Sequence, residues 1–548
     1  MSYQPKHMRG AETTCEGAVE PADAAPSRQE QVGRSAALMS ALVVVSRLTG
    51  FLRTWGQAFA LGTTVLASCY TVANNLPNLL YELVVGGMLV TAFLPVYMTV
   101  KRKLGTRGAS DYTSNLVSII LLLMGAVTLL GIAFAAQIVY TQSFSASADF
   151  DSGLATWFFR IFAVEVVLYA LSSIFSGVLN AERDYFWSSA APIFNNFVTT
   201  ASFFAYAFLA PHNQALALVL LALGNPLGVL VQVLMQMPSL RRHGIHLRLH
   251  IDWHDPALRD TVRLGVPSLV MVACTYVTTS VQTSASLAVT ASGASVSYYA
   301  RLWYTLPYAI LAVPLTTAMF TELSDSYAQG DMDGFRRGVS AGTSKIVFYL
   351  VPMAMLIYLF AEPLAAFFGL DAQSVDMTVS YLRGLVLALP LYGACMYFQK
   401  VCSAMHRMGL YAAANVVGSL IQTAACLLVA QRLGLFAVAL TSVLFFASID
   451  VVMLVSLRRK LGPFGAAGIL ASLLRSLVVG AAGVAVGFAI ISGLGHVLGP
   501  VGGSVGRALL FCVAGGIPSL VAVFGLAMAL RMPEVDFVRG LLRRVVRR

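Results

Sequence analysis

Long apolar runs alternate with short polar segments along almost the whole chain. About 20 apolar residues are enough for a helix to cross a bilayer, so each run is expected to be a membrane-spanning helix. The pattern therefore predicts an all-α polytopic membrane protein with about 14 transmembrane helices. The fourteen runs lie at 36–61, 66–100, 113–140, 154–180, 186–210, 214–237, 264–288, 296–322, 340–367, 376–402, 411–431, 434–457, 466–493 and 505–531.

The basic residues predict how these helices are oriented. Lys and Arg gather in alternate loops, such as 101–107, 241–242 and 458–460, whereas the opposite loops hold only Arg432. Cytoplasmic loops of membrane proteins accumulate Lys and Arg, so both termini are expected in the cytoplasm. Residues 1–34 lack an apolar core after a basic start, so no cleavable signal peptide is expected.

The spacing of the runs predicts two six-helix lobes followed by two further helices. Two lobes around a shared cavity are typical of transporters that expose the cavity alternately to each side of the membrane. The expected segments are a polar, disordered cytoplasmic tail at 1–34, an N-terminal lobe at 35–237, a cytoplasmic inter-lobe loop at 238–263, a C-terminal lobe at 264–457, two additional transmembrane helices at 458–531 and a basic cytoplasmic tail at 532–548.

Composition agrees with a membrane transporter and argues against an enzyme. Hydrophobic residues make up 58% of the chain and charged residues 11%, whereas soluble domains carry about 25% charged residues. HExxH and phosphate-cradling loop motifs are absent from the sequence, as is any paired-carboxylate motif. The seven cysteines are scattered without a CxxC, so we expect no disulfide framework, metal site or cofactor.

The net charge of +11 comes mainly from the loops and does not indicate a nucleic-acid partner. The tail at 539–548, RGLLRRVVRR, is expected to bind anionic phospholipids. The histidine-rich loop at 241–255 is interpreted as an interfacial hairpin or amphipathic strand rather than a metal site, because arginines and alternating apolar residues accompany its histidines.

Charged residues inside the predicted spans are candidates for the functional site. Ionisable side chains are costly at membrane depth and usually face a water-filled cavity or another protein group. Basic residues outnumber acidic ones there, which favours an anionic substrate. The candidates for substrate binding are Arg47, Arg53 and Arg301. The membrane potential acting on these arginines, or a monovalent ion bound by an acidic residue, would drive transport; the acidic candidates are Glu82, Glu165 and Asp450.

The second span combines residues that interrupt regular helices, namely Pro77, Gly86, Gly87 and Pro95. Proline removes a backbone donor and glycine lowers the cost of bending, so this span is the best candidate for a hinge. Close packing by small residues explains the same pattern equally well.

Four stretches resemble the MurJ/MviN lipid II flippases of the multidrug/oligosaccharidyl-lipid/polysaccharide exporter superfamily. The second is the most specific, because an LPN segment is followed by paired glycines and AFLPV. The stretches are SRLTGFLRT (46–54), ANNLPNLLYELVVGGMLVTAFLPVY (73–97), GVLNAERDYFWSSAAPIFNN (177–196) and SYYARLWYTLPYAILAVPLTT (297–317).

This resemblance implies a 14-helix fold in the bacterial cytoplasmic membrane. It also implies transfer of an undecaprenyl-diphosphate-linked disaccharide-peptide, lipid II, from the inner to the outer leaflet for peptidoglycan synthesis. The family places the head group in a cationic central cavity and the lipid tail in a groove beside the last two helices. Arg47 and Arg53 match the paired arginines of the family's first helix, and Arg301 is similar to a cavity arginine but aligns one position early.

Several positions depart from the family's charged pattern, namely Thr54, Ser68, Tyr81 and Gly86. Three alternatives therefore stay open: a flippase for another lipid-linked glycan, a drug/cation antiporter of the same superfamily, and a membrane scaffold that binds peptidoglycan-synthesis proteins without transporting anything.

Overall fold

The computed structural model describes residues 28–463, 465–502 and 504–535, and for 28–41, 86–92 and 256–268 it describes the backbone alone. Regular structure in these residues is helical, with no strand, which confirms the predicted all-α class. Each of the fourteen predicted runs coincides with one helix or with consecutive helices. Among the described residues, eight helices are long and apolar enough to cross a membrane, and ten spans result if each of two bent pairs counts as one. The number of fourteen crossings stays a prediction.

Within the described residues there are eight α-helices before the inter-bundle loop and twelve after it. The first eight are α1 (Arg28–Leu61), α2 (Val65–Tyr81), α3 (Gly87–Ala133), α4 (Ala135–Tyr140), α5 (Ser152–Phe162), α6 (Glu165–Ala181), α7 (Tyr185–Leu209) and α8 (Gln214–Arg242). The others are α9 (Pro256–Val289), α10 (Gly293–Pro307), α11 (Val313–Ala328), α12 (Met332–Leu359), α13 (Ala361–Ala366), α14 (Ala372–Val386), α15 (Leu389–Ala404), α16 (Met408–Ala425), α17 (Gln431–Leu433), α18 (Leu435–Leu461), α19 (Ala466–Leu498) and α20 (Val505–Ala529).

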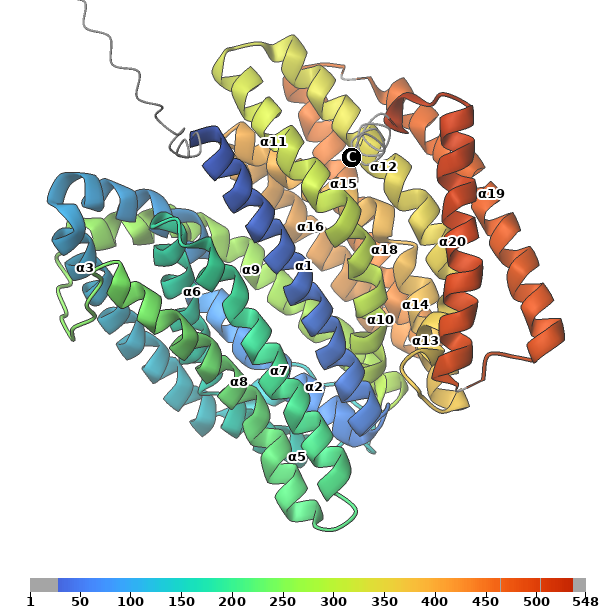
Figure 1. Ribbon diagram of the computed structural model, residues 1–548, viewed down its shortest axis with the longest axis horizontal. Coiled ribbons are helices and arrows are strands. Elements are labelled where there is room, and N and C mark those ends of the chain that lie inside the picture. The colour runs from blue at the N-terminus through green and yellow to red at the C-terminus, as the bar shows by residue number, and fades with distance from the viewer. Residues whose placement is uncertain (1–27, 464, 503, 536–548) are drawn as a thin grey trace, which may run out of the picture.

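The helices form two bundles with α1 running between them (Figure 1). Helices α2 to α8 make the first bundle, and α10 to α18 make the second. Helix α9 crosses from the first to the second, and α19 and α20 lie on the outer side of the second, where α19 packs along α12. The start of α1 and the end of α20 lie at the same edge of the molecule (Figure 1), as an even number of crossings requires.

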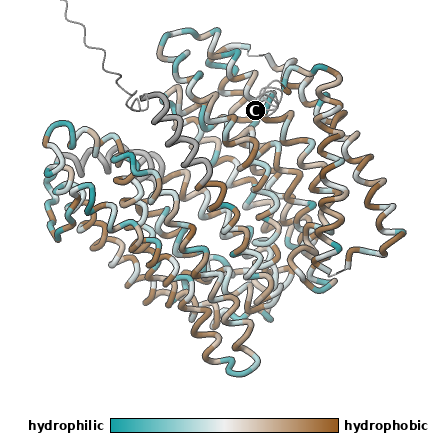
Figure 2. Tube along the Cα trace, in the orientation of Figure 1, coloured by the Kyte–Doolittle hydropathy of each residue, from teal (hydrophilic) through white to brown (hydrophobic). Residues whose placement is uncertain are grey.

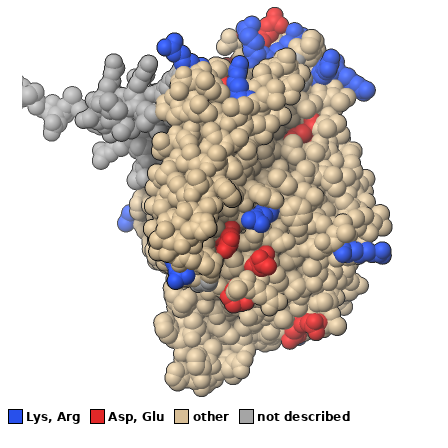
Figure 3. Space-filling view, turned by 90° about the vertical axis from the view of Figure 1, so that its right-hand side faces the viewer, with Lys and Arg blue, Asp and Glu red and all other residues tan. Residues whose placement is uncertain are grey.

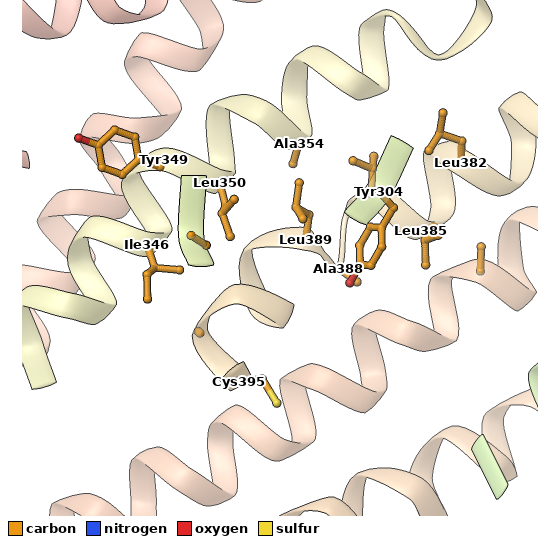
Figure 4. Close-up of a cluster of buried hydrophobic side chains, with 14 of the residues drawn as sticks. Tyr304, Ile346, Tyr349, Leu350, Ala354, Leu382, Leu385, Ala388, Leu389 and Cys395 are labelled. Atoms are coloured by element: carbon orange, nitrogen blue, oxygen red, sulfur yellow. The ribbon is translucent and has the colours of Figure 1, made fainter. Parts of the chain in front are cut away.

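Apolar side chains fill the bundles and also cover much of their outer surface. Figure 4 shows Tyr304, Leu350, Leu385 and Leu389 converging from α10, α12, α14 and α15 in the core of the second bundle. Figure 2 shows hydrophobic residues along most helices and hydrophilic residues mainly near their ends. On the face of the molecule shown in Figure 3, several Lys and Arg side chains lie at the top edge and others are scattered over the middle of the face. Such a surface suits contact with lipid on the sides and with water and head groups at the ends.

One helix, α3, connects the second and third predicted spans, between which the sequence predicts a loop. A π-helical turn at Glu82–Gly86 links α2 to α3, and α3 continues to Ala133 with a single break at Gly105. Gly105 has φ of 70°, a conformation that favours glycine because it has no Cβ atom. One glycine therefore turns the chain where the sequence predicts a loop.

The loop between the bundles is extended and lies along α3. The hydroxyl oxygens of Ser110, Ser114 and Ser118 accept hydrogen bonds from the backbone N–H groups of residues 246, 248 and 250, at 3.0, 3.2 and 3.0 Å. Four helical residues rise about 6 Å and two extended residues about 6.6 Å. Serines four residues apart on the helix therefore meet backbone amides two residues apart in the loop. Alternate backbone amides of the segment face α3, but residues 245–252 form neither the predicted hairpin nor a strand.

Removing these three serine hydroxyls should release the loop from α3. We expect the combined Ser110→Ala, Ser114→Ala and Ser118→Ala variant to exchange the amide protons of 246, 248 and 250 about a hundredfold faster, because three hydrogen bonds contribute about 1 kcal/mol each. Hydrogen exchange read by mass spectrometry measures this. Thr113→Ala is the matched control, because the Thr113 hydroxyl bonds only Ala109 of its own helix. Equal exchange in both variants would show that the serines do not hold the loop.

Candidate functional site

Two adjoining polar hollows lie between the bundles and meet at Arg301. One, of about 380 Å³, is lined by residues of α1, α2, α9 and α10. The other, of about 690 Å³, is lined mainly by residues of α9, α10, α15, α16 and α18. Both include Thr279, Arg301 and Thr305. Their walls consist largely of hydroxyl and amide side chains with aromatic rings, and such walls can hydrogen-bond an uncharged polar ligand such as a sugar or a peptide.

Arg301 projects from α10 and is held by a glutamine of α9. Its Nη2 donates to Oε1 of Gln282, and Nε2 of Gln282 donates to the Ser442 hydroxyl at 2.9 Å and to the Val438 carbonyl at 3.3 Å. Both ends of the Gln282 amide are thus satisfied, which limits how the arginine can turn. Within the described residues Arg301 forms no ion pair. A positive charge therefore faces both hollows without a protein anion bound to it.

Arg53 projects from α1 into the first bundle rather than into these hollows. Its Nη2 donates to Oδ1 of Asn225 on α8 at 2.9 Å. Nδ2 of Asn225 lies 2.9 and 2.8 Å from the two carboxylate oxygens of Glu165 and also donates to Asn74. Glu165 and Asn225 are fully buried. An amide therefore bridges the arginine and the glutamate, and their opposite charges compensate each other inside the bundle.

Arg47 lies apart from Arg53. Six helical positions separate the two residues, which places their side chains about 120° apart around α1. Arg47 is exposed and forms no hydrogen bond or ion pair with the described residues. Of the three predicted substrate-binding arginines, only Arg301 lines the two central hollows.

The three acidic candidates lie in three different places. Glu82 lines the larger hollow and accepts a hydrogen bond from Asn78 at 3.3 Å. Glu165 belongs to the buried network with Asn225. Asp450 lies on α18 at a third hollow, between the second bundle and α19. The structure does not bring these carboxylates together.

The hinge candidates surround an irregular stretch of helix. Pro77 lies inside α2 and precedes the π-helical turn Glu82–Gly86; Gly87 begins α3 and Pro95 lies within it. The second bundle has a comparable feature, because Pro307 is followed by a π-helical turn at Tyr308–Ala312. Such turns weaken the regular hydrogen-bond ladder and are common at functional sites. A hinge motion at either turn stays a prediction.

Residues that replace the family's charged positions take part in uncharged contacts. The backbone N–H of Ser295 donates to the Ser68 hydroxyl at 3.1 Å. The Tyr81 hydroxyl donates to Ser173 at 2.6 Å, and Thr54 lines the smaller hollow. Sequence reasoning missed the amides of Asn225 and Gln282, although polar amides within apolar spans are themselves a signal of interior contacts.

The second bundle contacts α1, the turn after α1 and the first bundle at the end that the basic residues predict to lie outside. The Tyr299 hydroxyl donates to the Gly62 carbonyl at 2.7 Å, and Nε1 of Trp55 donates to the Phe367 carbonyl at 3.3 Å. Phe51 packs against Trp303 and Phe367 with ring centroids 5.4 and 5.7 Å apart. These contacts close the outer side of the central hollows.

Weakening this closure should favour the outward-open state. We expect Tyr299→Phe to raise the population open to the outside about fivefold, because the variant loses one hydrogen bond, between α10 and the turn that joins α1 to α2, which contributes about 1 kcal/mol. Asn75 of α2 lines the smaller hollow. The labelling rate of Asn75→Cys, measured with an impermeant outside maleimide in a background without other reactive cysteines, reports this. Tyr397→Phe is the control, because the Tyr397 hydroxyl bonds Gly338 within the second bundle at 2.9 Å. A similar increase in both variants would contradict the assignment.

Two helical bundles around a polar cavity, closed at one end by inter-bundle contacts, define a membrane transporter of the two-lobe class. The sequence profile of the family described as "Lipid II flippase MurJ" matches residues 57–502. The chain belongs to this family.

Individual relatives agree over most of the chain. A probable lipid II flippase MurJ of Bdellovibrio bacteriovorus is 24% identical over 93% of this chain and 97% of its own length. One of Buchnera aphidicola subsp. Acyrthosiphon pisum is 24% identical over 59% of this chain and 63% of its own length.

Solved structures share the fold. A lipid II flippase MurJ in an inward closed conformation superposes with a TM-score of 0.71, at 18% identity, over 90% of this chain and 99% of that protein. An inward-facing multidrug resistance MATE family transporter of the MOP superfamily gives a TM-score of 0.61, at 15% identity, over 80% of this chain and 94% of that protein.

Proposed function

We propose that this protein is a lipid II flippase that carries its substrate from the inner to the outer leaflet by alternating access. Membership of the MurJ family supports the substrate. The observation that carries the mechanism is Arg301, an arginine without an ion-pair partner among the described residues, at the junction of two polar hollows that are closed on one side. Transport, rather than catalysis, is the activity of this family.

The chemistry of the cavity suits a diphosphate-linked glycopeptide. Such a head group cannot enter hydrocarbon unaided, because its charges and hydroxyls would lose water without replacement. A guanidinium group can hold phosphate oxygens with two parallel hydrogen bonds and stays charged. We infer that Arg301 binds the diphosphate and that the surrounding hydroxyl and amide groups replace the water around the sugar and the peptide.

The other two arginines take different roles in this proposal. Glu165 compensates the charge of Arg53 through Asn225, so Arg53 holds α1 against α8 and contributes less to substrate binding. Arg47 is free to meet the head group at an early stage of entry. The apolar hollow of about 630 Å³ beside α19 takes part of the lipid tail.

The family and the distribution of basic residues also support a cellular location and an orientation in the membrane. We propose a multi-pass protein of the bacterial cytoplasmic membrane with both termini inside, built from lobes at 35–237 and 264–457 and two additional helices within 458–531. The basic tail at 539–548 lies outside the described residues, and its binding to anionic phospholipids is a proposal from sequence. Binding to proteins of peptidoglycan synthesis is likewise a proposal from sequence.

Transport would be coupled to the membrane potential through uncompensated charge. Moving one elementary charge through 100 mV corresponds to about 2.3 kcal/mol, and Arg301 is the arginine whose charge the cavity leaves unpaired. Flux measured at clamped potentials, with sodium and proton gradients varied separately, tests this. Flux that does not change with potential would contradict it.

The central experiment uses purified protein in sealed vesicles that contain labelled lipid II. An impermeant outside probe reports transfer between leaflets, and faster transfer in the presence of the protein is the expected result. No acceleration by folded protein would contradict the proposal. Acceleration with another lipid-linked glycan alone, or with a cationic drug alone, would identify the protein as one of the other two transporter types. Complementation by variants that lack the cavity charge would indicate a scaffold.

A further inference from the structure

Asp450 is a buried carboxylate without a partner among the residues that the structure describes. The residue is 5% exposed, and neither carboxylate oxygen has a hydrogen-bond or ion-pair partner within the described residues. Its position on α18 is inside a membrane-spanning helix. Buried carboxylates are normally paired or hydrogen-bonded, because an isolated charge loses its hydration without compensation.

The surroundings of Asp450 are apolar. It lines a hollow of about 630 Å³ between α12, α15, α18 and α19, whose walls are mostly hydrocarbon. Leu391 and Phe398 of α15 and Ile469 of α19 contribute to these walls. Arg458 lines the same hollow, eight positions later on α18, which is about 12 Å along the helix axis. The hollow thus extends from Asp450 towards the basic end of α18.

The ionisable groups on the neighbouring helices do not neutralise Asp450. Cys395 of α15 and Tyr411 of α16 contact each other, with Sγ and the hydroxyl 3.3 Å apart. Nζ of Lys400 lies over the ring of Phe320, 5.4 Å from its centroid. Arg475 of α19 pairs with Glu534 at 3.0 Å. Lys345 of α12 and Arg458 likewise form no ion pair with Asp450.

A structural role does not explain this residue. A carboxylate that stabilised the fold would accept hydrogen bonds, as Glu165 does from Asn225 and Glu534 does from Arg475. In a dry apolar hollow the neutral acid is the favoured form, whereas water entering the hollow would favour ionisation. The same side chain would then bind or release a proton according to the hydration of the hollow.

We propose that Asp450 is a proton-binding site whose occupancy follows the state of the hollow between the second bundle and α19. The carboxylate takes one proton from water when the hollow becomes dry, and returns it to water near Arg458 when the hollow is hydrated. Filling the hollow with an apolar chain therefore drives proton uptake. The link to lipid transport rests on the proposed flippase function, whereas the proton site itself does not.

The first experiment detects the proton directly. Infrared spectra of the full-length protein in lipid nanodiscs at neutral pH should show the C=O stretch of a protonated carboxylic acid, and Asp450→Asn should remove it. Glu322→Gln is the matched control, because Glu322 is an exposed carboxylate on α11 whose removal should leave the band unchanged. The Asn substitution is nearly isosteric with the neutral acid, so the variant should fold. An identical band in wild type and Asp450→Asn would overturn the proton site.

The second experiment tests the link to transport. With the membrane potential clamped at zero, a pH difference of one unit should change lipid II transfer by up to about tenfold in the wild type and in Glu322→Gln, because proton activity changes tenfold. Transfer by Asp450→Asn should be insensitive to the pH difference. Equal sensitivity in Asp450→Asn and wild type would overturn the coupling. Lack of transfer by the wild type would contradict the flippase function instead, and the infrared result would stand independently.

Discussion

Replacing Arg301 with alanine should lower lipid II transfer in vesicles about a hundredfold. Two charge-assisted hydrogen bonds to a diphosphate contribute about 3 kcal/mol together, and the described residues offer no ion-pair partner whose release would compensate for this loss. Arg301→Lys should retain part of the activity, because an ammonium group keeps the charge but cannot form the planar two-bond contact. The rate of transfer to the outer leaflet, divided by the amount of folded protein, measures both effects.

A matched arginine outside the cavity provides the control. Nε of Arg383 donates to the Tyr358 carbonyl at 3.4 Å, and its guanidinium carbon lies 5.4 Å from the centroid of the Tyr358 ring. Arg383→Ala removes the same charge from the same lobe and should change transfer little. Similar losses in both variants, or full activity of Arg301→Ala, would exclude Arg301 as the diphosphate-binding group.

Replacing Asn225 with leucine should destabilise the protein by about 3 kcal/mol or more. Leucine has the same branched arrangement of four side-chain heavy atoms, although its methyl groups are bulkier, and it leaves both oxygens of Glu165 without the amide donor and Arg53 without its acceptor. Breaking a buried charged network by removing one partner costs about 3–5 kcal/mol. A lower midpoint of thermal unfolding in detergent, and a smaller fraction of monodisperse protein, are the expected observations.

The control for this prediction is Asn415→Leu. Asn415 is also a buried asparagine, but its Nδ2 donates only to the Tyr411 carbonyl of its own helix at 2.8 Å. Its loss should cost about 1 kcal/mol. Adding Asn225→Leu to the Glu165→Leu variant should lower the free energy of unfolding much less than adding it to the wild type, because the carboxylate is already absent. Equal effects of Asn225→Leu in both backgrounds would show that the two residues are not coupled.

Hydrophobic periodicity was sufficient to predict the all-α class and the position of most helices, because each membrane helix must satisfy its own backbone hydrogen bonds and present apolar side chains to lipid. Hydrophobic periodicity describes one segment of the chain at a time. It predicted a loop before 113, where a single glycine at 105 turns the chain within α3, because a one-residue break leaves no polar stretch to detect. The two π-helical turns after Pro77 and Pro307 likewise have no signature beyond the prolines.

The sequence alone determined which residues carry charge inside the membrane, and its motifs indicated the family. It could not determine which of those charges compensate one another, because that depends on side chains far apart in the chain. Arg53 meets Asn225, which in turn meets Glu165, across three helices, whereas Arg301 donates to the neutral Gln282 and has no ion-pair partner among the described residues. Asp450 and Glu165 are both buried carboxylates, but the neighbouring helices bring a donor to Glu165 and none within the described residues to Asp450. Packing therefore decided which arginine faces the central cavity uncompensated and which carboxylate is left without a partner. The physical reason is that a buried charged group without a hydrogen-bond or ion-pair partner costs several kcal/mol of free energy.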